Sequence, residues 1–197
     1  MKERKPLNHT GSVTLETKRL ILRKTNLSDA EQMFNNWASD PEVTKFLMWQ
    51  AHENISETKR VLSIWEEKND NLTYYHWGIV LKENNEIIGT CGDFGIHEHH
   101  YNNELGYCMS RKYWGQGYMS EAVNAMIKHF FDVVGLNRIS ARYHPDNIGS
   151  GKVMQKCNMV YEGVHRKAHY NEKLGGYYDL AVYAILKADY DVIDKEH

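Results

Sequence analysis

Residues 111–122 read RKYWGQGYMSEA, and this stretch decides the fold. It contains Gly115 and Gly117 one residue apart, and it separates a predicted strand from the strongest predicted helix of the chain. Two closely spaced glycines let the backbone turn tightly and expose consecutive N–H groups. Because the first N–H groups of the following helix are also unpaired, the stretch predicts a site for an anion such as a diphosphate.

Other nucleotide-binding loops fit this stretch poorly. It lacks the GK[ST] ending of a P-loop. Its glycine pattern ends in Ser120 instead of a third glycine, and it lies mid-chain after several predicted strands, whereas a dinucleotide-binding loop follows the first strand. A binder of ATP or NAD is therefore disfavoured. The local pattern alone supports a strand-to-helix turn without a ligand about as well as it supports an anion site.

Around this loop, hydrophobic periodicity predicts helices and strands in alternation. Residues 28–31 have the pattern of a capping box, opening a helix that ends at Asp40-Pro41, and Gly135 is placed to end the helix after the loop. Further helices are predicted near residues 56–68 and 148–157. The predicted strands cover residues 19–24, 74–81, 86–94, 104–109, 138–143, 160–168 and 177–187. This order predicts a mixed α/β sheet of about seven strands flanked by helices, and not a doubly wound parallel fold.

The composition is that of one globular domain, with 42% hydrophobic and 25% charged residues. The formal net charge of −2 gives no reason to expect nucleic acid or an anionic membrane as partner. Three cysteines without CxxC spacing argue against a disulfide framework and indicate a reducing, cytoplasmic setting. No apolar run suits a signal peptide or a membrane span. We expect a disordered or loosely held tail over residues 1–13, one domain over 14–190 and a C-terminal tail over 191–197.

Five segments, in this order, carry a resemblance that spans residues 14–188. They are TKRLILR at 17–23, DPEV at 40–43, ELGY at 104–107, YWGQGYMSEA at 113–122 and NIGSGKVMQKCNM at 147–159. Together they resemble the GNAT acetyltransferase superfamily, in the variant typical of the RimJ/RimL-like ribosomal-protein N-terminal acetyltransferases. The sequence departs from the general pattern at Met119, where that pattern has Gly or Ala.

The resemblance implies the acyl-CoA N-acyltransferase fold, with a mostly antiparallel central sheet flanked by helices. It also implies transfer of the acetyl group of acetyl-CoA to a primary amine, by direct attack in a ternary complex and without a metal. The acceptor stays open between a protein N-terminal α-amine and a small-molecule amine. The acidic net charge argues against a ribosomal substrate. A catalytically inactive CoA-binding sensor or interaction module on the same fold is the alternative, and a homodimer remains compatible with the sequence.

By resemblance, the backbone of the loop binds the CoA diphosphate, and the backbone of Met109 and Ser110 pairs with the pantetheine arm as another strand would. Asn147 is implied to contact the same arm, although on local grounds it is equally a turn residue after Pro145. The implied CoA-binding residues are Met109, Ser110, Trp114, Gly115, Gln116, Gly117, Tyr118, Met119, Ser120, Asn147, Ser150 and Lys156.

Two residues are implied to act on the reacting groups. Glu104 occupies the position of the family's proposed base. Its alternative role is that of a surface residue that merely starts a strand. Ser150 occupies a position near the CoA sulfur, where it could donate a hydrogen bond to the leaving thiolate; its alternative role is that of a helix N-cap. Met154 stands where many members carry a tyrosine that protonates the thiolate, and methionine has no proton to give. That departure favours the inactive alternative.

The sequence HEHH at residues 97–100 contains competent metal ligands. Adjacent positions on a polar loop rarely converge on one ion, and no HExxH or CxxC motif accompanies them. We therefore predict no metal site.

Overall fold

The structure is a computed structural model that describes residues 5–195, so residues 1–4 and 196–197 of the expected tails lie outside it. Its strands are β1 (Leu15–Glu16), β2 (Leu20–Arg23), β3 (His76–Leu81), β4 (Ile87–Asp93), β5 (Asn102–Met109), β6 (Arg138–Tyr143), β7 (Val160–Asn171) and β8 (Gly176–Leu186). Its α-helices are α1 (Ala30–Met33), α2 (Pro41–Thr44), α3 (Ile55–Glu67), α4 (Tyr118–His129), α5 (Ile148–Lys156) and α6 (Lys187–Lys195). Other helical turns, which are not α-helical, are η1 (Leu27–Asp29), η2 (Phe34–Ala38), η3 (Arg111–Tyr113), η4 (Phe130–Val134) and η5 (Glu172–Leu174).

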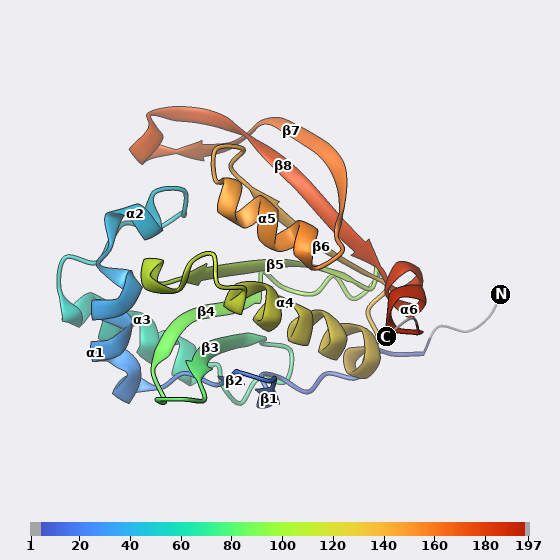
Figure 1. The fold of residues 1–197 in the computed structure, drawn as a ribbon, viewed down its shortest axis with the longest axis horizontal. Coiled ribbons are helices and arrows are strands. Elements are labelled where there is room, and N and C mark those ends of the chain that lie inside the picture. The colour runs from blue at the N-terminus through green and yellow to red at the C-terminus, as the bar shows by residue number, and fades with distance from the viewer. Residues whose placement is uncertain (1–4, 196–197) are drawn as a thin grey trace.

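The strands form one open sheet in the order β1-β2-β3-β4-β5-β6-β8-β7 (Figure 1). Every neighbouring pair is antiparallel except β5 and β6, which run parallel and are joined through α4. The prediction of a mixed, mostly antiparallel sheet flanked by helices is confirmed. Within the described residues the sheet has eight strands, and the strand that sequence analysis missed is the two-residue β1.

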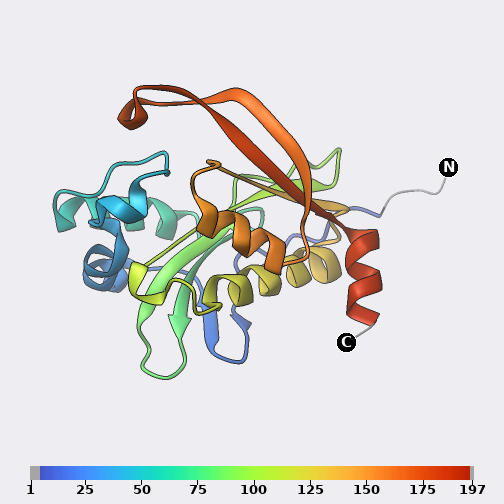
Figure 2. The ribbon, with the colours of Figure 1, turned by 45° about the horizontal axis from the view of Figure 1, so that its top comes forward.

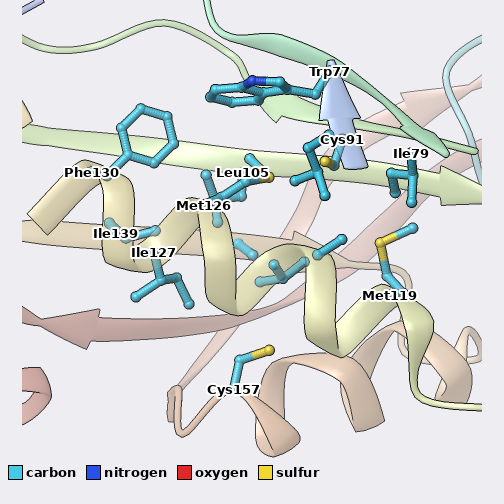
Figure 3. Close-up of a cluster of buried hydrophobic side chains, with 14 of the residues drawn as sticks. Trp77, Ile79, Cys91, Leu105, Met119, Met126, Ile127, Phe130, Ile139 and Cys157 are labelled. Atoms are coloured by element: carbon cyan, nitrogen blue, oxygen red, sulfur yellow. The ribbon is translucent and has the colours of Figure 1, made fainter. Parts of the chain in front are cut away.

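Hydrophobic side chains cover both faces of the sheet. In β3, Ile79 and Leu81 belong to the cluster beneath α4 and α5, whereas Val80 between them belongs to a second cluster with α1 and α3. This alternation follows from the two-residue period of a strand. Figure 3 shows the first cluster, with Met126 of α4 and Phe130 of η4 facing the strands. Helices α4 and α5 lie beside each other over this face (Figure 2).

The parallel strands β5 and β6 separate before they end. Their paired register runs only to Leu105 opposite Ala141, whereas β5 continues to Met109 and β6 to Tyr143. The loop after β5 leads into α4, and the segment after β6 leads into α5. The gap between the two strand ends therefore lies next to the starts of both helices.

The first helix begins differently from the prediction. The capping box consists of Asn26 and Asp29, not of residues 28–31. Asn26 has an extended backbone and its side chain accepts a hydrogen bond from the N–H of Ser28, while Asp29 accepts from the N–H of Asn26. Arg23 also binds the Asp29 carboxylate, which fixes it in this role. At the far end, Asp40 caps the short helix α2, so a second helix follows where we predicted only a stop.

The chain ends are more structured than the expected tails. The N–H of Asn8 donates to the carbonyl of Val134 at 2.9 Å, and that of Gly11 donates to Leu72 at 2.7 Å. The Ser12 hydroxyl lies 2% exposed between β3 and the preceding loop. Residues 187–195 form helix α6, which periodicity did not predict. These segments are ordered by contacts with distant parts of the chain, which a local pattern does not contain.

Candidate active site

The loop between β5 and α4 has the backbone of an anion site. Gly115 and Gly117 have positive φ angles of 75° and 82°, and Gly117 is the N-cap of α4 without a side-chain hydrogen bond. Among the described residues, none accepts a hydrogen bond from the N–H groups of residues 115–120. Six consecutive donors therefore lie free at the positive end of a twelve-residue helix.

An acidic residue in the first turn of α4 does not spoil this site. The Glu121 carboxylate accepts from the Thr17 hydroxyl at 2.6 Å and from the N–H and Nε of Arg19 at 2.8 and 2.7 Å. Burial alone would raise the pKa of Glu121, but these hydrogen bonds outweigh it and hold the pKa below its usual range. Arg19 also donates to the carbonyl of Gln116 and lies 4.0 Å from the ring centre of Tyr118. The negative charge is thus neutralised on the β1–β2 side of the helix.

Two further contacts hold the start of the loop. Arg111 Nε donates to Asp40 at 2.6 Å, which connects the loop to the cap of α2. The indole N–H of Trp114 donates to the carbonyl of Met109 at 2.8 Å. Segments that lie far apart in sequence therefore fix one loop.

A cavity of about 450 Å³ opens between this loop, the end of β5, the residues around α2 and helix α5. All the CoA-binding residues implied by the sequence line it except Ser110, Gln116 and Tyr118. Ser110 is buried and its N–H pairs with the carbonyl of Ile88. The Gln116 side chain folds back onto the carbonyl of Lys112. The backbone of Ser110, the side chain of Gln116 and the ring of Tyr118, which lies under Arg19, thus make contacts outside the cavity.

Ser150 faces this cavity with its hydroxyl free of any capping role. The N-cap of α5 is Asn147, whose side chain accepts from the N–H of Ser150 at 3.3 Å, so the alternative that Ser150 caps the helix is wrong. The Ser150 hydroxyl lies 3.1 Å from the phenol oxygen of Tyr107, which also donates to the Ser150 carbonyl at 3.1 Å. Met154 lies 1% exposed in the core and carries no proton for this site.

Sequence analysis named Tyr107 only as part of a motif and missed its place in the cavity. Its signal was strand periodicity, because Leu105, Tyr107 and Met109 share one face of β5 and the first and last of these belong to the core beneath α4 and α5. Beyond Leu105, β5 is no longer paired with β6, so a residue on that face can contact α5.

Glu104 lies apart from both the cavity and its loop. It pairs in register with Ser140, one position before the strands separate. Its carboxylate accepts from Nε of Arg142, with its two oxygens at 2.8 and 2.7 Å. This ion pair holds the Glu104 carboxylate beside Arg142, and neither hollow is lined by it.

A second hollow of about 550 Å³ adjoins the first and shares Lys45, Phe46 and Asp146 with it. Rings form its wall, with His144 between Phe46 at 4.8 Å and Tyr178 at 4.6 Å, measured between ring centres. The N–H of Asp146 donates to Nδ1 of His144, so the neutral imidazole carries its proton on Nε2. No sequence motif pointed to these residues.

Lys173, at the tip of the β7–β8 hairpin, contacts the chain around the end of α2. Its ammonium donates to the carbonyl of Thr44 at 3.0 Å and to that of Trp49. Burial lowers the pKa of Lys173. The hairpin is thereby tied to the segment that follows α2.

The HEHH loop does not assemble a metal site among residues 5–195, where no group of three or more His, Cys, Asp or Glu is arranged to hold an ion. Glu98 instead lies 2.6 Å from Nε2 of His9. In the same part of the chain, no helix has the length and apolar character to cross a membrane.

Comparisons with known proteins agree with this geometry. The chain is 34% identical over 177 residues to the uncharacterized N-acetyltransferase p20 of Bacillus licheniformis, which covers 90% of this chain and 98% of the relative. It is 26% identical over 162 residues to the ribosomal protein uS5-alanine N-acetyltransferase of Escherichia coli strain K12, covering 79% and 82%.

The fold matches the microcin C7 self immunity acetyltransferase MccE, solved in complex with acetyl-CoA and AMP, with a TM-score of 0.78 at 23% identity over 86% of this chain and 93% of that one. A family model described as an acetyltransferase (GNAT) domain matches residues 19–160. The chain therefore belongs to the GNAT acetyltransferase family.

Proposed function

We propose that this protein transfers the acetyl group of acetyl-CoA to a primary amine. The observation that carries the proposal is the first cavity, which the loop of free N–H groups at residues 115–120 borders through four of its residues, on the same hollow as Asn147 and Ser150. Such donors at a helix N-terminus suit a diphosphate, and Lys152 and Lys156 add positive charge to the same walls. The acetyl-CoA complex of MccE supports this choice of donor.

The pantetheine arm would lie in the gap where β5 and β6 separate, next to Met109. The Met109 carbonyl already accepts from Trp114, but a carbonyl oxygen has two lone pairs and can accept a second hydrogen bond. On this proposal the thioester would lie near Ser150, which lines the first cavity.

The amine attacks directly. Its lone pair forms a bond to the thioester carbonyl carbon, the carbon–sulfur bond breaks, and its electron pair goes to sulfur. The amine loses one proton and the thiolate gains one, so the products are an amide and the CoA thiol. Ser150 would donate a hydrogen bond to the sulfur as its charge develops. Cys108 lines the cavity, but burial raises the pKa of its thiol, which opposes a covalent acetyl-cysteine route.

The acceptor that fits best is an α-amine at a protein N-terminus, and a small-molecule amine is the second candidate. An α-amine has a pKa near ~7.7 and is partly neutral at physiological pH, whereas a lysine amine near ~10.4 needs a strong base. Glu104 is held by Arg142 and lines neither hollow, so a substrate that needs little help is favoured. The uS5-alanine N-acetyltransferase among the relatives supports the same acceptor class.

We also propose that the protein acts in the cytoplasm. Cys91, Cys108 and Cys157 are all free thiols, as expected in a reducing compartment.

The test begins with isothermal titration of acetyl-CoA, followed by CoA release over a panel of N-terminal peptides and small amines. Wild type is compared with Glu104→Gln and with Glu162→Gln, a matched control whose carboxylate pairs with Arg138 away from both hollows. We expect binding and turnover with peptides, and normal turnover in Glu162→Gln; loss of turnover in Glu104→Gln would assign Glu104 as the base that takes the amine proton. Absence of binding overturns the proposal. Binding without turnover on any acceptor leaves the inactive CoA-binding module, and normal turnover in Glu104→Gln removes Glu104 as the base.

A further inference from the structure

The gap between β5 and β6 contains a hydrogen-bonded pair of hydroxyl groups that bridges a strand and a helix. Tyr107 reaches from β5 to Ser150 in α5, and both residues line the first cavity. We propose that Tyr107 is a positioning residue that orients the Ser150 hydroxyl toward the sulfur of bound CoA. This inference rests on the proposed function, because it requires CoA in that cavity.

The backbone explains why Tyr107 can do this. The β5–β6 ladder ends at Leu105, and Tyr107 is the next residue on the same face. On its other side β5 stays paired with β4, where Tyr107 lies opposite Cys91, so the strand is held while the side chain crosses the gap. Burial raises the pKa of the Tyr107 phenol, which therefore keeps its proton over the working pH range.

The number of protons decides the orientation of Ser150. The phenol has one proton and two acceptors within 3.1 Å, the carbonyl and the hydroxyl oxygen of Ser150. If the phenol donates to the carbonyl, the Ser150 hydroxyl donates back to the phenol oxygen and is lost to the substrate. If the phenol donates to the Ser150 hydroxyl oxygen, the Ser150 proton is free to turn to sulfur.

A negative sulfur selects the second arrangement. The carbonyl of Ser150 lies within α5, where helical pairing satisfies it without the phenol. Two donors in series, from phenol to serine and from serine to thiolate, polarise one another and strengthen the final bond. Tyr107 thus supplies a hydroxyl to the leaving group through Ser150, although Met154 offers none.

Tyr143 provides a matched control. It is the corresponding tyrosine on β6, and its oxygen packs so closely that a Cβ added at Gly151 would lie 2.6 Å from it. Within the described residues its phenol forms no hydrogen bond with Ser150. Tyr143→Phe therefore removes a phenol from the same gap without touching the proposed pair.

The decisive measurement needs no acceptor. CoA is bound to the protein, and ionisation of its thiol is followed by the ultraviolet absorbance of the thiolate as pH is raised, in wild type, Tyr107→Phe, Ser150→Ala, the double variant and Tyr143→Phe. A hydrogen bond to the thiolate increases the acid dissociation constant of the thiol. We expect Tyr107→Phe to decrease that constant about tenfold, the size of one charge-assisted hydrogen bond. Ser150→Ala should do at least the same, and the double variant should match Ser150→Ala.

A kinetic measurement separates orientation from folding. With an acceptor in hand, Tyr107→Phe should lower kcat and leave the KM for acetyl-CoA near its wild-type value, because the pair acts on the leaving sulfur. An unchanged thiol ionisation in Tyr107→Phe, or equal changes in Tyr107→Phe and Tyr143→Phe, overturns the inference while the proposed function stands. Absence of CoA binding in wild-type titrations overturns both.

Discussion

The two adjoining hollows are built in different ways. The cavity proposed for CoA is formed at its loop by backbone N–H groups of one continuous stretch, residues 115–120. The second hollow is formed by three separate segments, through the side chains of Lys45, Phe46, His144, Asp146, Tyr177 and Tyr178 and the backbone of Gly175 and Gly176. On the proposed function, backbone geometry would bind the CoA donor in the first hollow, and side chains of the second hollow would select the acceptor. The first hollow therefore follows from one recognisable stretch of sequence, whereas the second is assembled from segments that share no motif.

The largest effect should come from Gly117→Val. Its φ of 82° is strained for any side chain and most of all for a branched one, at a cost of about 2 kcal/mol, so acetyl-CoA affinity should fall about thirtyfold. Gly175→Val carries similar strain, at φ 71° with no atom within 4 Å of an added Cβ, but lies at the second hollow. Isothermal titration of both variants checks this. Equal loss of acetyl-CoA affinity in the two would contradict the separation of the hollows.

The next effect concerns the ties that hold the loop. Glu121→Gln should lower the free energy of unfolding by about 2 kcal/mol and weaken acetyl-CoA binding several-fold, because Thr17 and Arg19 lose a charged acceptor. Glu16→Gln breaks an exposed pair with Lys82 and should cost less than about 0.5 kcal/mol. Urea unfolding of the two variants measures both values. A Glu121→Gln protein as stable as Glu16→Gln would show that the loop does not depend on this tie.

A smaller effect is expected at the second hollow. Lys173→Met frees the hairpin tip from the carbonyls of Thr44 and Trp49, and should raise the KM for the acceptor about fivefold while acetyl-CoA affinity is unchanged. Lys128→Met is the control, because that ammonium pairs with Asp132 away from both hollows. Steady-state kinetics with both substrates varied provides the test. A change in acetyl-CoA affinity would mean that the two hollows are coupled.

The smallest effect is on pH dependence. Glu121 has a folded pKa below its unfolded value near ~4.3, so its stabilisation is complete above that value and is lost as pH falls through the folded pKa. Unfolding free energies from pH 7 to acid should therefore fall more steeply in wild type than in Glu121→Gln. Parallel curves for the two proteins would refute this assignment.

Asp93 changes the unfolding free energy with pH in the opposite direction, so its contribution has to be removed before the two proteins are compared. Burial raises its pKa to about 7, so its contribution to stability is present below the unfolded pKa near ~3.9 and is lost as pH rises to about 7. Asp93→Asn should abolish that loss, and the Glu121 comparison is then made in this background.

The local sequence pattern predicted helices and strands well where the signals for an element lie within one stretch of the chain. The seven predicted strands were all found, and Gly135 ends the helical segment after the loop with a φ of 91°, as expected of a C-cap glycine. The error at the first helix has a local cause, since Asn26 and Asp29 form an equally good capping box two residues earlier and Arg23 favours it. The ordered segment around Ser12 and the strand β1 depend on distant partners, so periodicity could not reveal them.

The sequence by itself determined the loop of exposed backbone donors, because φ-permissive glycines before an amphipathic helix are enough to leave those N–H groups unpaired. It also determined the mixed sheet, because strand and helix periods differ. Only the tertiary structure decided how the separate motifs meet, with Thr17 and Arg19 on Glu121 and Asp40 on Arg111. It alone placed Tyr107 on Ser150 and Arg142 on Glu104, since those contacts follow from where two parallel strands stop pairing. Side-chain contacts across such a gap are set by tertiary packing, which leaves no periodic pattern in the sequence.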